Sequence, residues 1–108
     1  MTHFVFVESR DPHESTDCQT LQELAAGLAS RGHHVTLFLV QNAVLPARAG
    51  SRFSGQLTGL ASRGVRVVAD AFALRERAVA ECARGVSAAN IDELLRLIME
   101  PDTRALWH

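Results

Sequence analysis

Residues 28–40 read Leu-Ala-Ser-Arg-Gly-His-His-Val-Thr-Leu-Phe-Leu-Val, and this stretch decides the fold. A cation at Arg31 followed by Gly32 is typical of the end of a helix, since glycine accepts the left-handed conformation there. Residues 35–40 are apolar without polar alternation, which is typical of a strand covered on both faces. The stretch therefore predicts a helix joined tightly to a strand of a parallel sheet.

The same junction occurs again further along the chain. Residues 60–64 repeat the Leu-Ala-Ser-Arg-Gly of residues 28–32, at the end of a predicted helical face over 53–61. A further apolar strand is predicted over 65–69, and another over 4–7. Alternating strands and helices with short joins indicate right-handed crossovers and an α/β fold with a parallel sheet.

The remaining elements are predicted from helix signals. Thr16 and Gln19 fit a capping box that would open the first helix. Residues 70–83 are predicted as a third helical region because they are rich in alanine and arginine. Asn90 is predicted to cap a fourth helix, and residues 103–107 are expected to form a last strand.

The composition indicates one folded domain covering residues 1–108. Hydrophobic residues make up 47% of the chain, and the net charge is −1. We therefore expect no nucleic-acid partner, and no stretch is long and apolar enough for a membrane span. The eleven basic residues are all arginine, which excludes Schiff-base chemistry and a P-loop lysine.

Cysteine content and the N-terminal sequence predict where the protein works. Two cysteines are too few for a secreted disulfide scaffold, and this favours a reducing compartment. Residues 1–5 lack a basic region and a long apolar run, so no secretory signal is predicted. We expect the bacterial cytoplasm. No cofactor motif is present, including the glycine-rich dinucleotide pattern, and no cofactor is predicted.

Three stretches are similar to the sequences of one known family. They are residues 4–17 with Asp11-Pro12, residues 24–44 with Arg31-Gly32-His33-His34-Val35, and residues 64–94 with Gly64-Val65-Arg66-Val67 and Ile91-Asp92-Glu93-Leu94. Through them the chain resembles the DsrE/DsrF-like family of sulfur-relay proteins over almost its full length. The middle stretch is the most specific. The resemblance implies a three-layer α/β/α sandwich around a five-stranded, mostly parallel sheet. It also implies a trimer or a hexamer of stacked trimers.

Catalytic members of this family hold a cysteine just after the third strand. That cysteine accepts sulfur as a persulfide and passes it to a partner protein. In this chain the matching position falls at Ala73, and no cysteine lies between Cys18 and Cys82. The resemblance therefore implies a non-catalytic subunit, such as those that occur in heteromeric complexes of the family.

Polar residues are expected to meet where parallel strands end, because open α/β sheets bind ligands at that edge. The predicted crevice is lined by Arg10, His13, Asn42, Asp70 and Arg75, with Glu8 nearby. Arginine and a helix N-terminus there would suit an anion such as a sulfur oxyanion or phosphate. The alternative is a solvated loop of charged side chains.

The two thiols and five histidines complete the candidate residues. Cys18 lies at the start of the first helix, where the partial positive charge lowers a thiol pKa, but its phase also fits a side chain facing the sheet. Cys82 is expected in the core of the third helix. The histidines form no metal-ligand spacing, His108 among them, so no metal site is predicted.

Three functions remain open from the sequence. The first is a non-catalytic or partner-binding subunit of a homo-oligomer or of a complex with related subunits, with a possible sulfur-relay partner. The second is a small-molecule or anion-binding oligomer. The third is a sulfurtransferase that uses Cys18.

Overall fold

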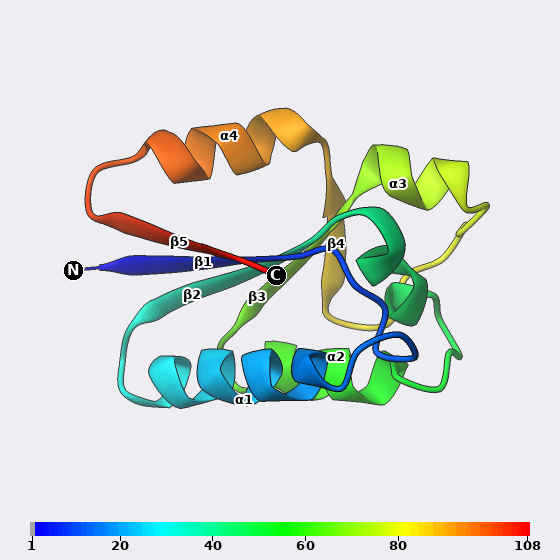
Figure 1. Ribbon diagram of the computed structural model, residues 1–108, viewed down its shortest axis with the longest axis horizontal. Coiled ribbons are helices and arrows are strands. Elements are labelled where there is room, and N and C mark those ends of the chain that lie inside the picture. The colour runs from blue at the N-terminus through cyan, green and yellow to red at the C-terminus, as the bar shows by residue number, and fades with distance from the viewer. Residues whose placement is uncertain (1) are drawn as a thin grey trace.

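Five apolar runs form the strands of one sheet in the computed structural model, which describes residues 2–108 (Figure 1). The strands are β1 (His3–Glu8), β2 (His34–Leu39), β3 (Arg66–Asp70), β4 (Val86–Ala89) and β5 (Thr103–Trp107). Their order is β4-β3-β2-β1-β5, and all neighbours are parallel. The predicted fold class is confirmed.

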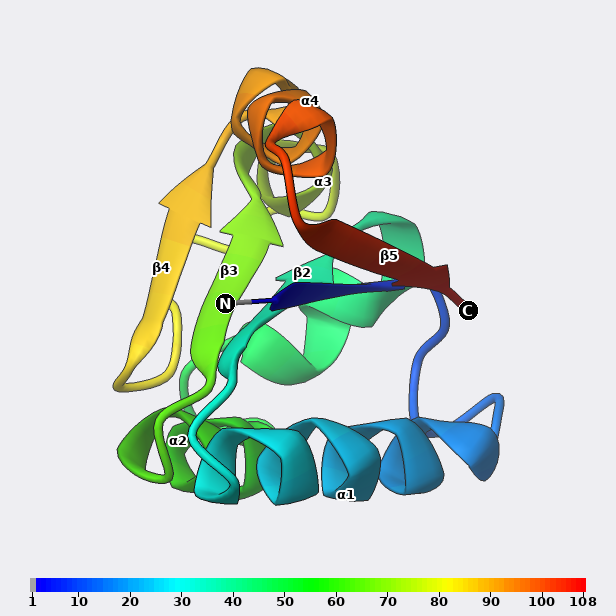
Figure 2. The same ribbon diagram turned by 90° about the vertical axis from the view of Figure 1, so that its left-hand side faces the viewer.

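Helices cover both faces of this sheet (Figure 2). One face is covered by α1 (Asp17–Ser30) and α2 (Ser54–Ser62), and the other by α4 (Ile91–Met99). The short helix α3 (Ala71–Glu76) and the 3-10 helix η1 (Gln41–Ala47) follow the carboxyl ends of β3 and β2. The molecule therefore has the three layers that were expected.

The strand register explains why the strands lack polar alternation. Phe6 pairs with Leu37, and both lie in the core under α1 and α2. The next pair, Val7 with Phe38, lies in the smaller core under α4. Each strand supplies apolar side chains to both cores in turn, because both faces of the sheet are covered.

The repeated Arg-Gly junction has the predicted role. Gly32 and Gly64 follow α1 and α2 with φ angles of +88° and +95°. In both cases the chain then enters a strand of the sheet. Glycine is favoured at these positions because a side chain would be strained in the left-handed conformation.

The predicted capping box is wrong. Thr16 has helical angles (φ −73°, ψ −16°) and makes no side-chain bond to the first turn of α1. The loop before Thr16 already forms a hydrogen-bonded turn, in which the backbone N–H groups of Glu14 and Ser15 donate to the carbonyl of Asp11. Asn90 is the N-cap residue of α4 as predicted, although its side chain makes no capping bond.

The predicted third helix over 70–83 is also wrong beyond Glu76. Ala78 has a φ of +54°, and the segment after it pairs with the end of η1 through a bridge between Arg48 and Cys82. These tertiary hydrogen bonds override the helix propensity of the alanine-rich segment. Cys82 therefore lies on an extended segment and not on a helix.

Strand β4 was not predicted from the residues themselves. Its sequence, Val-Ser-Ala-Ala, is too short and too weakly apolar to show a strand pattern, yet it pairs with β3 along its whole length. Residues 41–47, which contain Pro46, form the 3-10 helix where no regular structure was predicted. No helix among the described residues has the length and apolarity needed to cross a bilayer.

Candidate functional site

The carboxyl edge of the sheet carries a hollow of about 490 Å³ between α3, α4 and β5. We call it the Asp70 crevice. Five aromatic or charged side chains line it, and Asp70, Arg77 and Trp107 are among them. Its complete lining is Val40, Gln41, Asp70, Phe72, Ala73, Glu76, Arg77, Ile91, Leu94 and Trp107.

Asp70 is positioned by its place between β3 and α3. Its Oδ2 accepts a hydrogen bond from the Ala73 backbone N–H at 3.2 Å, so the carboxylate caps the helix. Its Oδ1 is buried and has no hydrogen-bond partner among the described residues. An unpaired buried acceptor is costly, and a ligand or partner with an N–H or O–H donor would satisfy it.

Arg77 places a positive charge at the rim of the Asp70 crevice. Its Nε and Nη2 donate to Asn42 Oδ1 at 3.2 and 3.0 Å, and its Nη1 donates to the Ala73 carbonyl at 3.4 Å. Asn42 in turn donates to Glu14. The predicted site residue Asn42 therefore lies at this edge, where it holds an arginine in place.

His13 lies in a neighbouring hollow of about 370 Å³, which Arg77 also lines. Its Nδ1 is 3.1 Å from Asp11 Oδ1, and its ring meets Phe53 edge to face. Arg10 and Arg75 are exposed and line neither hollow among the residues that the structure describes. The structure thus brings Asn42, Asp70 and His13 to Arg77, and leaves Arg10 and Arg75 outside.

Sequence reasoning missed Arg77, although a signal for it existed. In a helix that starts after Asp70, the fourth residue beyond Ala73 is Arg77 and lies on the same face. Arg75 is only two residues beyond Ala73 and points elsewhere. Ala73, where the resemblance to the DsrE/DsrF-like family predicts the carrier cysteine, is buried in the wall of the crevice.

Neither thiol lies in the Asp70 crevice. Cys18 is 2% exposed, and its Sγ donates to the Arg10 carbonyl at 3.4 Å. Burial and, next, the nearby Glu8 carboxylate raise the pKa of this thiol to about 11. The expected lowering by the helix N-terminus is therefore outweighed. Cys82 is half-buried, and burial raises its pKa too.

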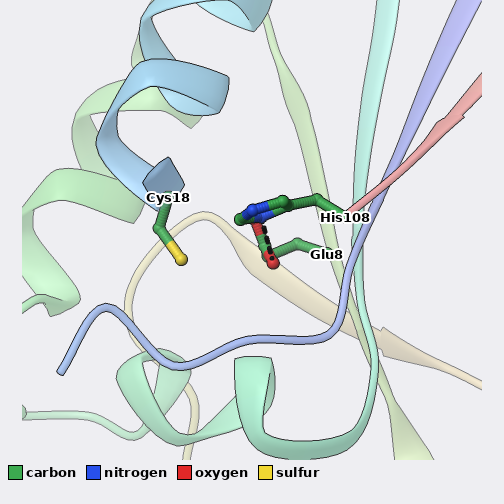
Figure 3. A group of neighbouring side chains, drawn as sticks. All are labelled: Glu8, Cys18 and His108. Carbon is green, nitrogen blue, oxygen red and sulfur yellow. Dashed lines mark hydrogen bonds and ion pairs between the residues drawn. The ribbon is translucent and has the colours of Figure 1, made fainter. Parts of the chain in front are cut away.

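Glu8 and His108 form a pair that sequence reasoning did not predict. Glu8 is 4% exposed at the end of β1, and His108 Nδ1 lies 2.9 and 2.7 Å from its two carboxylate oxygens (Figure 3). The Ser9 hydroxyl also donates to the His108 carbonyl at 2.8 Å. No local pattern shows this pairing, because it arises from the register of β5 on β1.

Comparisons with known proteins find similar structures, but none of them assigns an activity. No family model matches the chain, and no curated protein matches its sequence. Among solved structures, the ychN protein from E. coli is similar with a TM-score of 0.89 at 21% identity, and the match covers both chains completely.

Two further structures are proteins of unknown function. BT1422 from Bacteroides thetaiotaomicron has a TM-score of 0.81 at 14% identity, covering 98% of this chain and 94% of that one. MTH1491 from Methanobacterium thermoautotrophicum has a TM-score of 0.78 at 18% identity over both full lengths. These likenesses show that the chain has the fold of this group of small α/β proteins.

Proposed function

We propose that the chain is a DsrE/DsrF-like subunit that acts by assembly and binding, without persulfide chemistry of its own. The observation that carries the proposal is Ala73, which stands in the wall of the Asp70 crevice where the family's carrier cysteine is expected. Alanine has no atom that can hold sulfur. A subunit of this kind would present its crevice and its surface to other subunits or to a sulfur-relay protein in the cytoplasm.

The burial of Cys18 argues against its use as a substitute carrier. A persulfide forms when a thiolate attacks a sulfur donor, so the thiol must be accessible and ionised. Cys18 is 2% exposed. Its pKa, raised to about 11 by burial and by Glu8, keeps the thiol protonated at neutral pH.

An apolar surface on the α4 side supports the assembly part of the proposal. Ile91, Leu95 and Met99 form an exposed stripe along α4, since they are four residues apart. Phe72 and Trp107, which is 66% exposed, lie beside the Asp70 crevice. We call these five residues the α4 surface. Exposed apolar side chains gathered in this way are typical of protein interfaces, and we expect further copies of this chain to cover them.

The sulfur test compares the natural chain with an Ala73→Cys variant. Both are incubated with a persulfide donor, and intact-mass and peptide mass spectrometry locate any added sulfur atom. We expect no adduct on the natural chain and an adduct at position 73 of the variant. Both positions are buried, but Ala73 lines the open Asp70 crevice, whereas Cys18 does not line it. Transfer of sulfur to Cys18 in the natural chain would overturn the proposal. Cys18→Ala is the control that assigns any signal to that thiol.

The assembly test uses light scattering across protein concentrations. We expect a mass that is a multiple of 11.8 kDa, and we expect Leu95→Glu and Trp107→Glu to shift it towards the monomer. Leu24→Glu is the matched control, because Leu24 is an exposed leucine of α1 on the other side of the sheet. A monomer at every concentration, or equal effects of all three variants, would contradict the role of the α4 surface.

A second candidate function is the binding of a small anion in the Asp70 crevice. Arg77 supplies the positive charge, and the unpartnered Oδ1 of Asp70 calls for a donor on the same ligand. Thermal-shift measurements test this with nucleotides, whose N–H and O–H groups supply the donor, and with sulfite and thiosulfate, which test the negative charge alone. A ligand-induced rise in melting temperature should disappear in Arg77→Gln and persist in Arg75→Gln, which changes an exposed arginine in the last turn of α3. Persistence of the rise in both variants would place binding elsewhere.

A further inference from the structure

Three potential metal ligands meet beside the ends of β1 and β5 (Figure 3). They are Glu8 at the end of β1, Cys18 in the first turn of α1, and His108 directly after β5. A carboxylate oxygen, Sγ and one ring nitrogen of these residues all lie within 4.8 Å of one another. Each comes from a different element, so only the folded chain brings them together.

The surroundings of this cluster are acidic and shielded from solvent on the side of Glu8 and Cys18. Glu8, Cys18 and Asp11 are buried, and Asp17 Oδ2 lies 3.9 Å from His108 Nε2. Among the described residues, the cation that acts on Cys18 is Arg10, which is exposed and gives Glu8 its backbone N–H. Glu8 has partners in the Arg10 N–H and His108, but its carboxylate disfavours a second negative charge on the adjacent Cys18 sulfur. A bound cation would neutralise both.

We propose that Glu8, Cys18 and His108 bind a divalent transition-metal ion of the zinc type. A set of one thiolate, one imidazole and one carboxylate suits Zn²⁺, which accepts sulfur, nitrogen and oxygen ligands in a tetrahedral site. The all-oxygen sites preferred by Mg²⁺ and Ca²⁺ differ from this set. The proposal is independent of the Asp70 crevice and of the assembly proposed above.

The coordination chemistry requires modest changes in the cluster. Tetrahedral bond lengths of about 2.0–2.3 Å need ligand atoms somewhat closer than 4.8 Å, which side-chain rotation can provide. The Cys18 thiol releases its proton to solvent when Sγ binds the metal. The fourth position is open to water. Asp17 lies at Nε2 of His108, the ring nitrogen that does not face Glu8.

The location within the sheet supports a bound ligand. In the sheet, β1 lies between β2 and β5, so the strand order reverses between β1 and β5. The connection from β1 runs through α1 on one face of the sheet, and the connection into β5 comes from α4 on the other face (Figure 2). Open α/β sheets bind ligands outside the carboxyl ends of strands where the strand order reverses. A metal here would join α1 to both β1 and β5.

Cobalt absorption and zinc calorimetry test the site on protein without a histidine tag, since added histidines would bind metal themselves. We expect one equivalent of Zn²⁺, and a near-ultraviolet thiolate-to-Co²⁺ charge-transfer band. Cys18→Ser should abolish the band, and His108→Asn and Glu8→Gln should weaken Zn²⁺ binding by about 10-fold or more. Cys82→Ser is the matched control and should leave both signals unchanged, because Cys82 lies outside the cluster.

The band separates this site from the three histidines at the opposite edge of the sheet, His3, His33 and His34, which have no sulfur ligand. Absence of the band from the natural chain overturns the proposal without any variant, so a variant that fails to fold does not leave the question open. Loss of the band in Cys82→Ser, or zinc binding by Cys18→Ser as tight as that of the natural chain, overturns it as well.

Discussion

The two faces of the sheet are covered by helices to different degrees. Under α1 and α2 lies a core of seventeen buried residues that takes in Phe6, Leu37 and Leu57. Under α4 the core has six buried residues, and the α4 surface around it stays exposed. One helix cannot cover a face that two helices cover on the other side. The difference indicates that the α1/α2 face stabilises the single chain, whereas the α4 face is available for contact with other molecules.

The largest expected difference between the two faces is in the loss of a leucine. Leu57→Ala, in the α1/α2 core, should lower the free energy of unfolding by about 2–5 kcal/mol, because it leaves a cavity in a fully buried site. Leu95→Ala, in the α4 surface, should change it by less than about 0.5 kcal/mol in the dissociated protein. Urea unfolding measures both. Equal losses would remove the contrast.

A glycine tests how tightly the α1/α2 side is packed next to β4. A Cβ at Gly85 would lie 2.7 Å from Ala61 Cβ in α2, at a φ of +89°. Strain and overpacking together should cost Gly85→Ala roughly 2–4 kcal/mol. Gly32→Ala has nearly the same φ, +88°, with open space around it, and should cost about 1 kcal/mol. Urea unfolding measures both costs. Equal costs would mean that only the backbone conformation destabilises the variants and that α2 shifts to make room for the added methyl group.

Loss of the Asp70 side-chain cap at the start of α3 should have a smaller effect on the free energy of unfolding. Asp70→Ala removes the hydrogen bond from the Ala73 N–H and should cost about 1 kcal/mol. Asp70→Asn keeps an acceptor and should cost less, since it also removes the charge next to the unpartnered Oδ1. Thermal unfolding compares the two. A larger loss for Asn would show that the negative charge itself stabilises the edge of the crevice.

The smallest expected effect is a pH dependence on the α4 side. Burial and then the neighbouring His34 lower the pKa of His3, with Arg66 acting in the same direction and Glu100 opposing it. A depressed histidine pKa means that the unfolded chain binds more protons below its ordinary value of 6.5, so stability is lost as the pH falls below that value. The natural chain should lose stability between pH 7.5 and 5.5 more than His3→Gln does. Parallel pH profiles would contradict this.

Local sequence patterns predicted β1, β2, β3 and β5 and the ends of α1 and α2. Apolar runs and Arg-Gly junctions depend on burial and on backbone conformation, which neighbouring residues largely set. The same local reasoning extended α3 to residue 83 and missed β4, because the bridge from Arg48 to Cys82 and the pairing with β3 decide those segments. The number of strands was predicted only through the family resemblance.

The candidate sites divide in the same way. The sequence by itself determined that position 73 holds alanine and that polar residues, Asn42 and Asp70, stand at or just after the ends of two apolar strands. Only the tertiary structure decided that Cys18 is buried and that His108 meets Glu8. The reason is that a strand pattern specifies which faces are covered but not which strand becomes its neighbour, and the pairing of β5 with β1 joins residues from opposite ends of the chain.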